Sequence, residues 1–401
     1  MSHPLISIIV TAMSSPPSIA PHLHFSEAEL AARRAVTIKQ LVKDGLDGLL
    51  MFRQESMYYL TGYDSFGYVF FQCLYLGADG RMALLTRAPD RRVARHTSVI
   101  PEIRIWVDRP DARPAEDLRQ MLDELGCRGR RLGVEWDAYG LTARNGRALA
   151  EALAGFCALE DASYTVTHQR AVKRPAEIAY VRKAAALADK ALAEAAPLIK
   201  PGAFEGDILA ALQGAVFRGD GDYPGNEFII GSGPAATLGR YISGRRTLGA
   251  DDQLTLEFAG VYRHYHACLM RTIKVGKPAQ AQIDMHACAL DALEACAEAL
   301  KPGARVGAAY AAYIRTLEKA GYLEDNLNSC GYSLGTTFSP NWMDWPMCYR
   351  DNPVEIQPGM VFFLHMAITA KGLNVAPGET FLVTERGSER LGAAPIALTL
   401  T

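Results

Sequence analysis

The densest set of reactive side chains lies in EFAGVYRHYHACLMR, which begins at Glu257. Alternation along a strand sends Glu257 to one face and groups His264, His266, Cys268 and Met270 on another. Two histidines at i and i+2 can bind a metal ion or share acid–base chemistry. A carboxylate in an apolar strand is costly to bury without a partner. We therefore take Glu257, His264 and His266 as candidate functional residues, with ordinary solvent-exposed sheet positions as the alternative.

Two later ionisable residues also stand within or beside apolar segments. His365 interrupts the apolar run VFFLHMAI, and Glu379 stands at the entrance to TFLVT. Each could instead be a core residue with satisfied hydrogen bonds. Two of the four tryptophans, Trp342 and Trp345, lie in TTFSPNWMDWPMCYR, which its prolines predict to be a loop. Aromatic side chains there can enclose a small ligand or anchor the loop on the core.

Hydrophobic periodicity predicts the elements that position these residues. The segment 26–43, SEAELAARRAVTIKQLVK, begins with a Ser26/Glu29 cap and predicts an amphipathic helix. Further on, the sequence predicts strands at 47–52, 68–77, 81–87 and 131–136, and helices near 114–126 and 141–153. Alternating strands and helices indicate a small α/β domain over residues 26–165.

The pattern changes near residue 160. A long Ala-rich helix is predicted from Pro175, and the helices and strands after it do not alternate strictly. This favours an α+β domain with a mostly antiparallel sheet over residues 166–401. The tetrapeptide KPGA occurs at 200–203 and again at 301–304, each time between two predicted helices. The matching context favours a duplicated helix–turn–helix unit over coincidence.

Composition and charge exclude several classes of protein. The chain has 401 residues, 49% hydrophobic and 21% charged, which fits two globular domains. With 42 basic and 44 acidic residues, the net charge of −2 gives no reason to expect nucleic acid or an anionic membrane as partner. The eight cysteines form no Cys-x-x-Cys pair, which indicates reduced thiols and a cytoplasmic location.

The first 25 residues are expected to form a leader without regular structure. Their apolar run LISIIVTAM lacks the basic region of a secretion signal and is too short to span a bilayer. Either Met1 or Met13 could be the true start.

These features together resemble the creatinase, prolidase and aminopeptidase P superfamily, especially its ectoine hydrolase and creatinase branches. The resemblance implies a C-terminal pita-bread domain with pseudo-twofold symmetry, which agrees with the repeated KPGA, and a homodimer. It is carried by YLTGYD (59–64), QRAVKRPAEIAYVRKA (169–184), LEFAGVYRHYHACLMRT (256–272), CGYSLG (330–335) and QPGMVFF (357–363).

The metallopeptidases of this superfamily hold two metal ions with two Asp, one His and two Glu. None of these five residues is kept in this chain, where the corresponding positions are Glu257, Cys268, Tyr332, His365 and Gly378, the last beside Glu379. Hard divalent ions need several carboxylate oxygens. The resemblance therefore implies neither a dinuclear metal centre nor another cofactor.

Creatinase and similar enzymes also lack the metal set and use a histidine as general base. The resemblance places that position at Arg240. Arginine cannot act as a base near neutral pH, but its guanidinium binds carboxylates in two-pronged fashion. We therefore expect Arg240 to bind a substrate carboxylate, and His266 or His365 to take a proton from water.

The catalytic and substrate-binding roles of the other candidate residues are also hypotheses. Glu257 and Glu379 would orient the imidazole and stabilise positive charge on the substrate nitrogen. Tyr332 could donate to a developing oxyanion. The other candidates for substrate binding are His264, Trp342 and Trp345, with Tyr63 and Phe66 of the N-terminal domain completing the pocket across a dimer interface, as the resemblance implies.

The sequence thus predicts a metal-independent hydrolase of a C–N bond in a small zwitterionic or carboxylate-bearing metabolite, ectoine-like or creatine-like. One alternative is a lyase that uses the same pocket for elimination. Another is a ligand-binding pseudo-enzyme. An Xaa-Pro dipeptidase is least consistent with the residues, because its metal ligands are absent.

Overall fold

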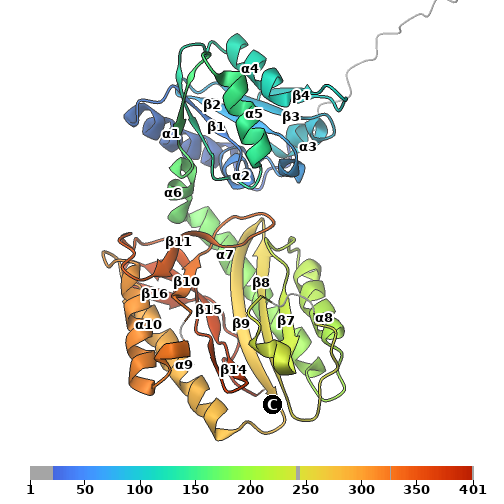
Figure 1. Cartoon of the computed structure of the whole chain (residues 1–401), viewed down its shortest axis with the longest axis vertical. Helices are drawn as coiled ribbons and strands as arrows, with labels where there is room; N and C mark the ends of the chain where they lie inside the picture. Colours follow the sequence, from blue (N-terminus) through green and yellow to red (C-terminus); the bar gives the residue numbers. More distant parts are fainter. Residues whose placement is uncertain (1–20, 241–243, 326, 400–401) are drawn as a thin grey trace, which may run out of the picture.

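The computed structural model describes residues 21–240, 244–325 and 327–399, which form two domains joined by short helices (Figure 1). The expected leader lies largely outside these ranges, and so does LISIIVTAM. Residues 21–25 do not fit that expectation, because Phe25 is buried against Tyr58, Tyr180 and Tyr265.

The N-terminal domain has a six-stranded mixed sheet with helices on both faces. Its strand order is β4-β3-β2-β1-β5-β6. Alternate residues of β1 enter two separate cores, with Leu50 on the face covered by α4 and α5 and Leu49 on the face covered by α1, α2 and α3. The elements are α1 Glu27–Lys43, β1 Gly48–Met51, α2 Gln54–Thr61, β2 Cys73–Gly77, β3 Met82–Arg87, α3 Asp90–Thr97, β4 Glu102–Trp106, α4 Pro114–Glu124, β5 Arg131–Val134, α5 Ala143–Leu153 and β6 Ala158–Asp161.

Local chemistry explains where these elements agree with the predictions and where they differ. Helix α1 starts where expected, since the backbone N–H of Glu29 donates to the Ser26 hydroxyl at 3.2 Å. The strand predicted from residue 68 begins only at Cys73. A 3₁₀ turn, Gly67–Val69, precedes it because the Gly67 N–H bonds the Ser65 hydroxyl at 2.8 Å.

Helix α6 (Thr165–Ala171) connects the domains, and it contacts both α1 and the C-terminal strand β11. Helix α7 then starts at Pro175, as predicted, and runs to Ala195.

The C-terminal domain is an antiparallel sheet in the order β11-β10-β12-β15-β9-β8-β7, with β16 added to β15 and β13 paired with β14. Helix α7 packs on β8 and β9, and α9 packs on β12 and β14 (Figure 1). The elements after α7 are α8 Glu205–Arg218, β7 Ile229–Ser232, β8 Asp252–Tyr262, β9 Tyr265–Val275, α9 Gln280–Ala299, α10 Gly307–Ala320, β10 Ser329–Ser333, β11 Asp344–Tyr349, β12 Val361–His365, β13 Ile368–Ala370, β14 Leu373–Val375, β15 Gly378–Thr384 and β16 Gly387–Arg390; short 3₁₀ turns are η2 Ala196–Leu198, η3 Gly233–Thr237 and η4 Leu323–Asp325.

The two KPGA segments make the same backbone contacts. In the first, the Gly202 N–H donates to the Leu248 carbonyl at 2.8 Å, and the Leu248 N–H returns a bond to Ala203 at 2.8 Å. In the second, Gly303 and Ile356 form the equivalent bond at 2.9 Å, and Ile356 donates to Ala304 at 2.8 Å. The repeated sequence therefore marks a repeated structural unit, as the pseudo-twofold pita-bread arrangement requires.

The tryptophan segment is only partly the predicted loop. Residues Asp344–Tyr349 form strand β11, which pairs with β10. The predicted loop is wrong here because Pro346 does not prevent a strand at this position. Strand β11 lies at the edge of the sheet, where a missing backbone donor is tolerated.

None of the helices in the described ranges is both long and apolar enough to span a membrane.

Candidate active site

A cavity of about 430 Å³ opens on the C-terminal sheet and gathers several predicted residues. Strands β7 to β14 contribute to its wall, together with the loops around them. Its lining residues are Asn226, Ile229, Ala236, Thr237, Gly239, Arg240, Thr255, Glu257, Met270, Leu327, Ser329, Tyr332, Asn341, Trp342, Met343, Met347, His365, Ala367, Thr369 and Asn374.

Glu257 is the carboxylate of this cavity. It lies on β8, partly buried, and its Oε1 accepts a hydrogen bond from the Tyr332 hydroxyl at 3.3 Å. The Trp342 indole N–H in turn donates to the Tyr332 oxygen at 2.9 Å. Burial raises the pKa of Glu257 to about 7, although the Tyr332 bond and the charge of Arg240 oppose the rise. Glu257 can therefore exchange a proton near neutral pH.

His365 ends strand β12 beside the same space. Its ring contacts those of Tyr332 and Phe363, with centroids 5.7 and 5.5 Å away, and it makes no hydrogen bond to the described residues. Burial, and to a lesser degree the charge of Arg240, lower the pKa of His365 to about 4. The imidazole is thus neutral at pH 7, with one N–H donor and one acceptor nitrogen free for a ligand.

Arg240 supplies the positive charge of the cavity. It follows η3, which is tied to β8 because the Thr255 hydroxyl donates to the Ala236 carbonyl at 2.9 Å. Its guanidinium is exposed and forms no ion pair with the described residues, while its charge acts on both Glu257 and His365. A carboxylate bound to Arg240 would therefore lie next to the acid–base groups.

The expectation that Glu257 and the pair Cys268 and Met270 lie on opposite faces of the sheet is wrong. The sequence predicts separate strands at 254–262 and 266–275, and residues 252–262 and 265–275 are indeed the two strands of a hairpin, so alternation along a single strand does not decide which side chains share a face. Glu257 pairs directly with Met270, and Ala259 pairs with Cys268. Cross-strand partners share a face, so Met270 lines the cavity beside Glu257.

His266 does not reach the cavity. It is fully buried, its Nε2 accepts from the Gly225 N–H at 2.8 Å, and its Nδ1 lies 3.2 Å from the Thr337 hydroxyl. Burial lowers the pKa of His266 to about 3. Both nitrogens are therefore engaged in holding two loops together, and the Nε2 lone pair is not available to accept a proton from water.

His264 and Phe66 border a different cavity, of about 470 Å³, between the two domains. His264 lies in the turn between β8 and β9, and its Nε2 is 2.9 Å from the Asp64 carboxylate of the N-terminal domain. Phe66 is 71% exposed at the rim. Asn226 lines both cavities, so the second one adjoins the first.

Three other candidates lie apart from the Glu257 cavity. Glu379 is fully buried in an ion-pair cluster with Arg271 and with Arg390, the latter at 2.9 Å. Trp345 packs against the His168 ring, 4.3 Å between centroids. Tyr63 is buried inside the N-terminal domain, where its hydroxyl donates to Gln72 at 3.2 Å. Trp345 and Tyr63 thus have structural contacts, whereas Glu379 uses one oxygen in the ion-pair cluster and keeps the buried Oε2 without a hydrogen-bond partner in the described part of the chain.

Several cavity residues were not predicted. Asn226 anchors the tryptophan loop, since its side-chain oxygen accepts from the Trp342 N–H at 3.1 Å. Met343 and Met347 also line the cavity, as does Met270. An isolated Asn or Met gives no sequence signal, although Met343 and Met347 stand next to the tryptophans that were singled out.

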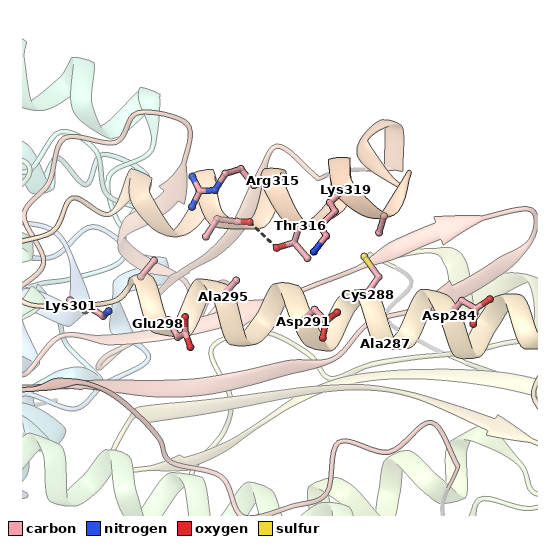
Figure 2. A pocket seen from close by; sticks show the side chains of 13 residues that line it. Asp284, Ala287, Cys288, Asp291, Ala295, Glu298, Lys301, Arg315, Thr316 and Lys319 are labelled. Carbon is pink, nitrogen blue, oxygen red and sulfur yellow. Dashed lines mark hydrogen bonds between the residues drawn. The ribbon is translucent and has the colours of Figure 1, made fainter.

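A larger cavity, of about 880 Å³, lies between α9 and α10 (Figure 2). Its walls are alanines and Cys288, with Asp284, Asp291 and Glu298 along α9 and Arg315 and Lys319 along α10. None of the residues that carry the candidate chemistry lines this groove. Size alone therefore does not identify the candidate active site.

The fold and the cavity define a two-domain protein with a mixed N-terminal sheet and a C-terminal pita-bread domain. Residues 179–385 match the metallopeptidase family M24 and residues 33–172 match the creatinase/prolidase N-terminal domain, so the chain belongs to family M24.

Known proteins are similar over nearly the whole chain. An uncharacterised hydrolase/peptidase, y4tM of Sinorhizobium fredii, is 28% identical over 93% of this chain and 97% of its own. The ectoine hydrolase of Halomonas elongata is 27% identical over the same shares. Among solved structures, a prolidase from Thermococcus sibiricus superimposes with a TM-score of 0.83 at 20% identity, covering 94% of this chain and all of its own. At that identity the structural likeness concerns the fold alone.

The residues at the metal positions of the family do not fit a metal centre. Cys268 is fully buried, and burial raises the pKa of its thiol well above the ordinary value. A side chain at Gly378 would bring Cβ to 2.7 Å from the Phe363 ring and 2.8 Å from Met270. Within the described ranges, no three His, Cys, Asp or Glu side chains are grouped so that they could hold a metal ion. The remaining donors, Glu257 and His365, are too few for a dinuclear site.

Proposed function

We propose that this protein hydrolyses a C–N bond, other than an ordinary peptide bond, in a small carboxylate-bearing compound and does so without a metal ion. The observation that carries the proposal is the grouping of three ionisable side chains in one cavity, Glu257, His365 and Arg240. Similarity to an ectoine hydrolase over most of the chain supports the same class of substrate.

Glu257 acts as the general base and then as the general acid. Its carboxylate takes a proton from the attacking water while the water oxygen bonds to the substrate carbon, and it returns that proton to the leaving nitrogen as the C–N bond breaks. A pKa of about 7 suits both steps, because the group changes protonation state near the working pH. This role replaces the expected base, His266 or His365, because the acceptor nitrogen of His266 is engaged by Gly225 and burial lowers the pKa of His365 to about 4.

Tyr332 and Trp342 position the carboxylate. Their two hydrogen bonds form a chain from the indole to Glu257 and hold one carboxylate oxygen in place. The other oxygen is free to contact water.

His365 and Arg240 bind the substrate. The neutral His365 ring donates its N–H to the oxygen on which negative charge develops. Arg240 binds the substrate carboxylate and orients the scissile bond between His365 and Glu257. A small molecule is thus the proposed partner, and the homodimer stays a prediction.

Product analysis in ¹⁸O-labelled water tests the proposal. Protein dialysed against a chelator would be incubated with N-acyl amino acids, cyclic amidines and Xaa-Pro dipeptides. We expect one ¹⁸O atom in the product of a non-peptide substrate, and formation of that product slowed by about 10²–10⁴-fold with Glu257→Gln. Elimination products without label would indicate a lyase, and turnover confined to dipeptides with added metal would contradict the proposal.

A further inference from the structure

The Glu257 cavity has two chemically different ends. Arg240 belongs to the segment between β7 and β8, at one end of the sheet order, and Met347 belongs to β11 at the other end. Glu257 and His365 lie on strands between these ends. A ligand whose carboxylate binds Arg240 therefore extends across the reacting groups toward the β10–β11 side.

That second end carries two methionine side chains. Met343 and Met347 line the cavity there, with Ser329 and Asn341 as polar neighbours, and Met270 lies beside Glu257. Met347 pairs with Tyr332 across β10 and β11, and the Met343 N–H donates to the Asn341 side chain at 3.0 Å. Both backbones are fixed, while the two side chains are only partly buried. The thioether chains thus present an unfilled apolar surface to the cavity.

We propose that the substrate is an N-acyl amino acid whose aliphatic acyl chain lies on Met343 and Met347 and whose carboxylate is bound by Arg240. This rests on the proposed hydrolysis at Glu257. Water adds to the acyl carbon, the C–N bond breaks, and the proton held by Glu257 moves to the nitrogen, so that the products are a carboxylic acid and a free amino acid. Unbranched methionine side chains adapt to differently shaped apolar groups. The site therefore accepts several acyl chains but selects for apolar length.

A homologous series of substrates measures this selection. We expect kcat/KM to rise from N-acetyl- through N-butanoyl- to N-hexanoylglycine, by about fourfold for each methylene that becomes buried. N-hexanoylglycinamide, which lacks the carboxylate, should be a poor substrate.

Two substitutions test which residues bind the chain. Met343→Gln and Met347→Gln keep side-chain length but add a polar amide, so each should lower the hexanoyl-to-acetyl ratio of kcat/KM. Lys319→Gln, in the α9–α10 groove of Figure 2, is the matched control and should leave the ratio at its wild-type value.

Calorimetric binding of the same series separates this inference from the proposed function. Turnover without dependence on chain length would overturn the inference and leave hydrolysis standing. Binding that tightens with chain length and weakens in the Gln variants, without turnover, would support the inference and contradict hydrolysis. Neither binding nor turnover would overturn both.

Discussion

The Tyr332 hydroxyl donates a hydrogen bond to the Glu257 carboxylate at 3.3 Å while it accepts one from the Trp342 indole at 2.9 Å. Tyr332 thus stabilises the ionised form of a carboxylate that burial drives toward the protonated form. The balance of these two effects keeps the pKa of Glu257 near neutrality.

Replacing Tyr332 with Phe should shift the pH dependence of the reaction. Loss of the donor raises the pKa of Glu257 above about 7, so less of the base is ionised at pH 7. We expect kcat/KM to fall at pH 7 and to recover at higher pH, which a pH–rate profile measures. Trp342→Phe should shift the profile less, since it acts only through Tyr332. An unshifted acid limb in both variants would show that Glu257 is not the base.

Glu257→Gln should reduce turnover by about 10²–10⁴-fold, the usual contribution of a general base, while raising stability at alkaline pH. Between pH values of about 4.5 and 7 the folded protein keeps a proton on Glu257 that the unfolded chain has released. The unfolding free energy of the wild type therefore falls as pH rises through this window. Glu257→Gln has no titrating carboxylate at this position, so its unfolding free energy does not fall for this reason.

Urea unfolding at pH 4.5 and pH 8 would detect that difference. We expect the unfolding free energy of Glu257→Gln, relative to that of the wild type, to be higher at pH 8 than at pH 4.5. An equal difference at both pH values would mean that Glu257 titrates normally in the folded protein.

The two histidines should respond oppositely to alanine substitution. His365→Ala breaks no hydrogen bond to the described residues but removes the proposed oxyanion donor, so kcat should fall by about 10²–10³-fold with little change in stability. His266→Ala leaves the Gly225 N–H without its acceptor and should cost about 1–3 kcal/mol of unfolding free energy. Denaturant titration and turnover per folded molecule distinguish the two effects. Abolished turnover in a fully folded His266→Ala would restore His266 as the candidate base.

Chelation should not affect the reaction. The positions that bind metal in the family hold Cys268, Gly378 and other residues that offer too few carboxylate oxygens. We expect full activity after dialysis against EDTA, and elemental analysis should find far less than one metal ion per chain. About two equivalents of Mn, Co or Zn, with activity that depends on them, would contradict this expectation.

Much of the fold was readable from the sequence because the deciding signals are local. The Ser26 cap and the proline that opens α7 each act within a few residues, and each is found where predicted. The repeated KPGA was readable because the same four residues occur twice, although their backbone partners are distant in sequence. The family resemblance also rests on continuous motifs. Glu257, Trp342 and His365 became candidates because they interrupt apolar or proline-containing segments, and Tyr332 because the resemblance places it at a metal position; all four line one cavity.

Only the tertiary structure decided which of these side chains share a cavity. The partner of His266 is 41 residues away in sequence, and that of Glu379 is 108 residues away. Whether a polar side chain is satisfied depends on such distant partners, which composition and periodicity do not record. His266 lies in a loop contact and Glu379 in an ion-pair cluster, both away from the Glu257 cavity, whereas the methionines beside Trp342, which gave no sequence signal, line that cavity. The sequence alone determined the family and the two domains; long-range hydrogen bonding and strand register decided where the free ionisable groups meet.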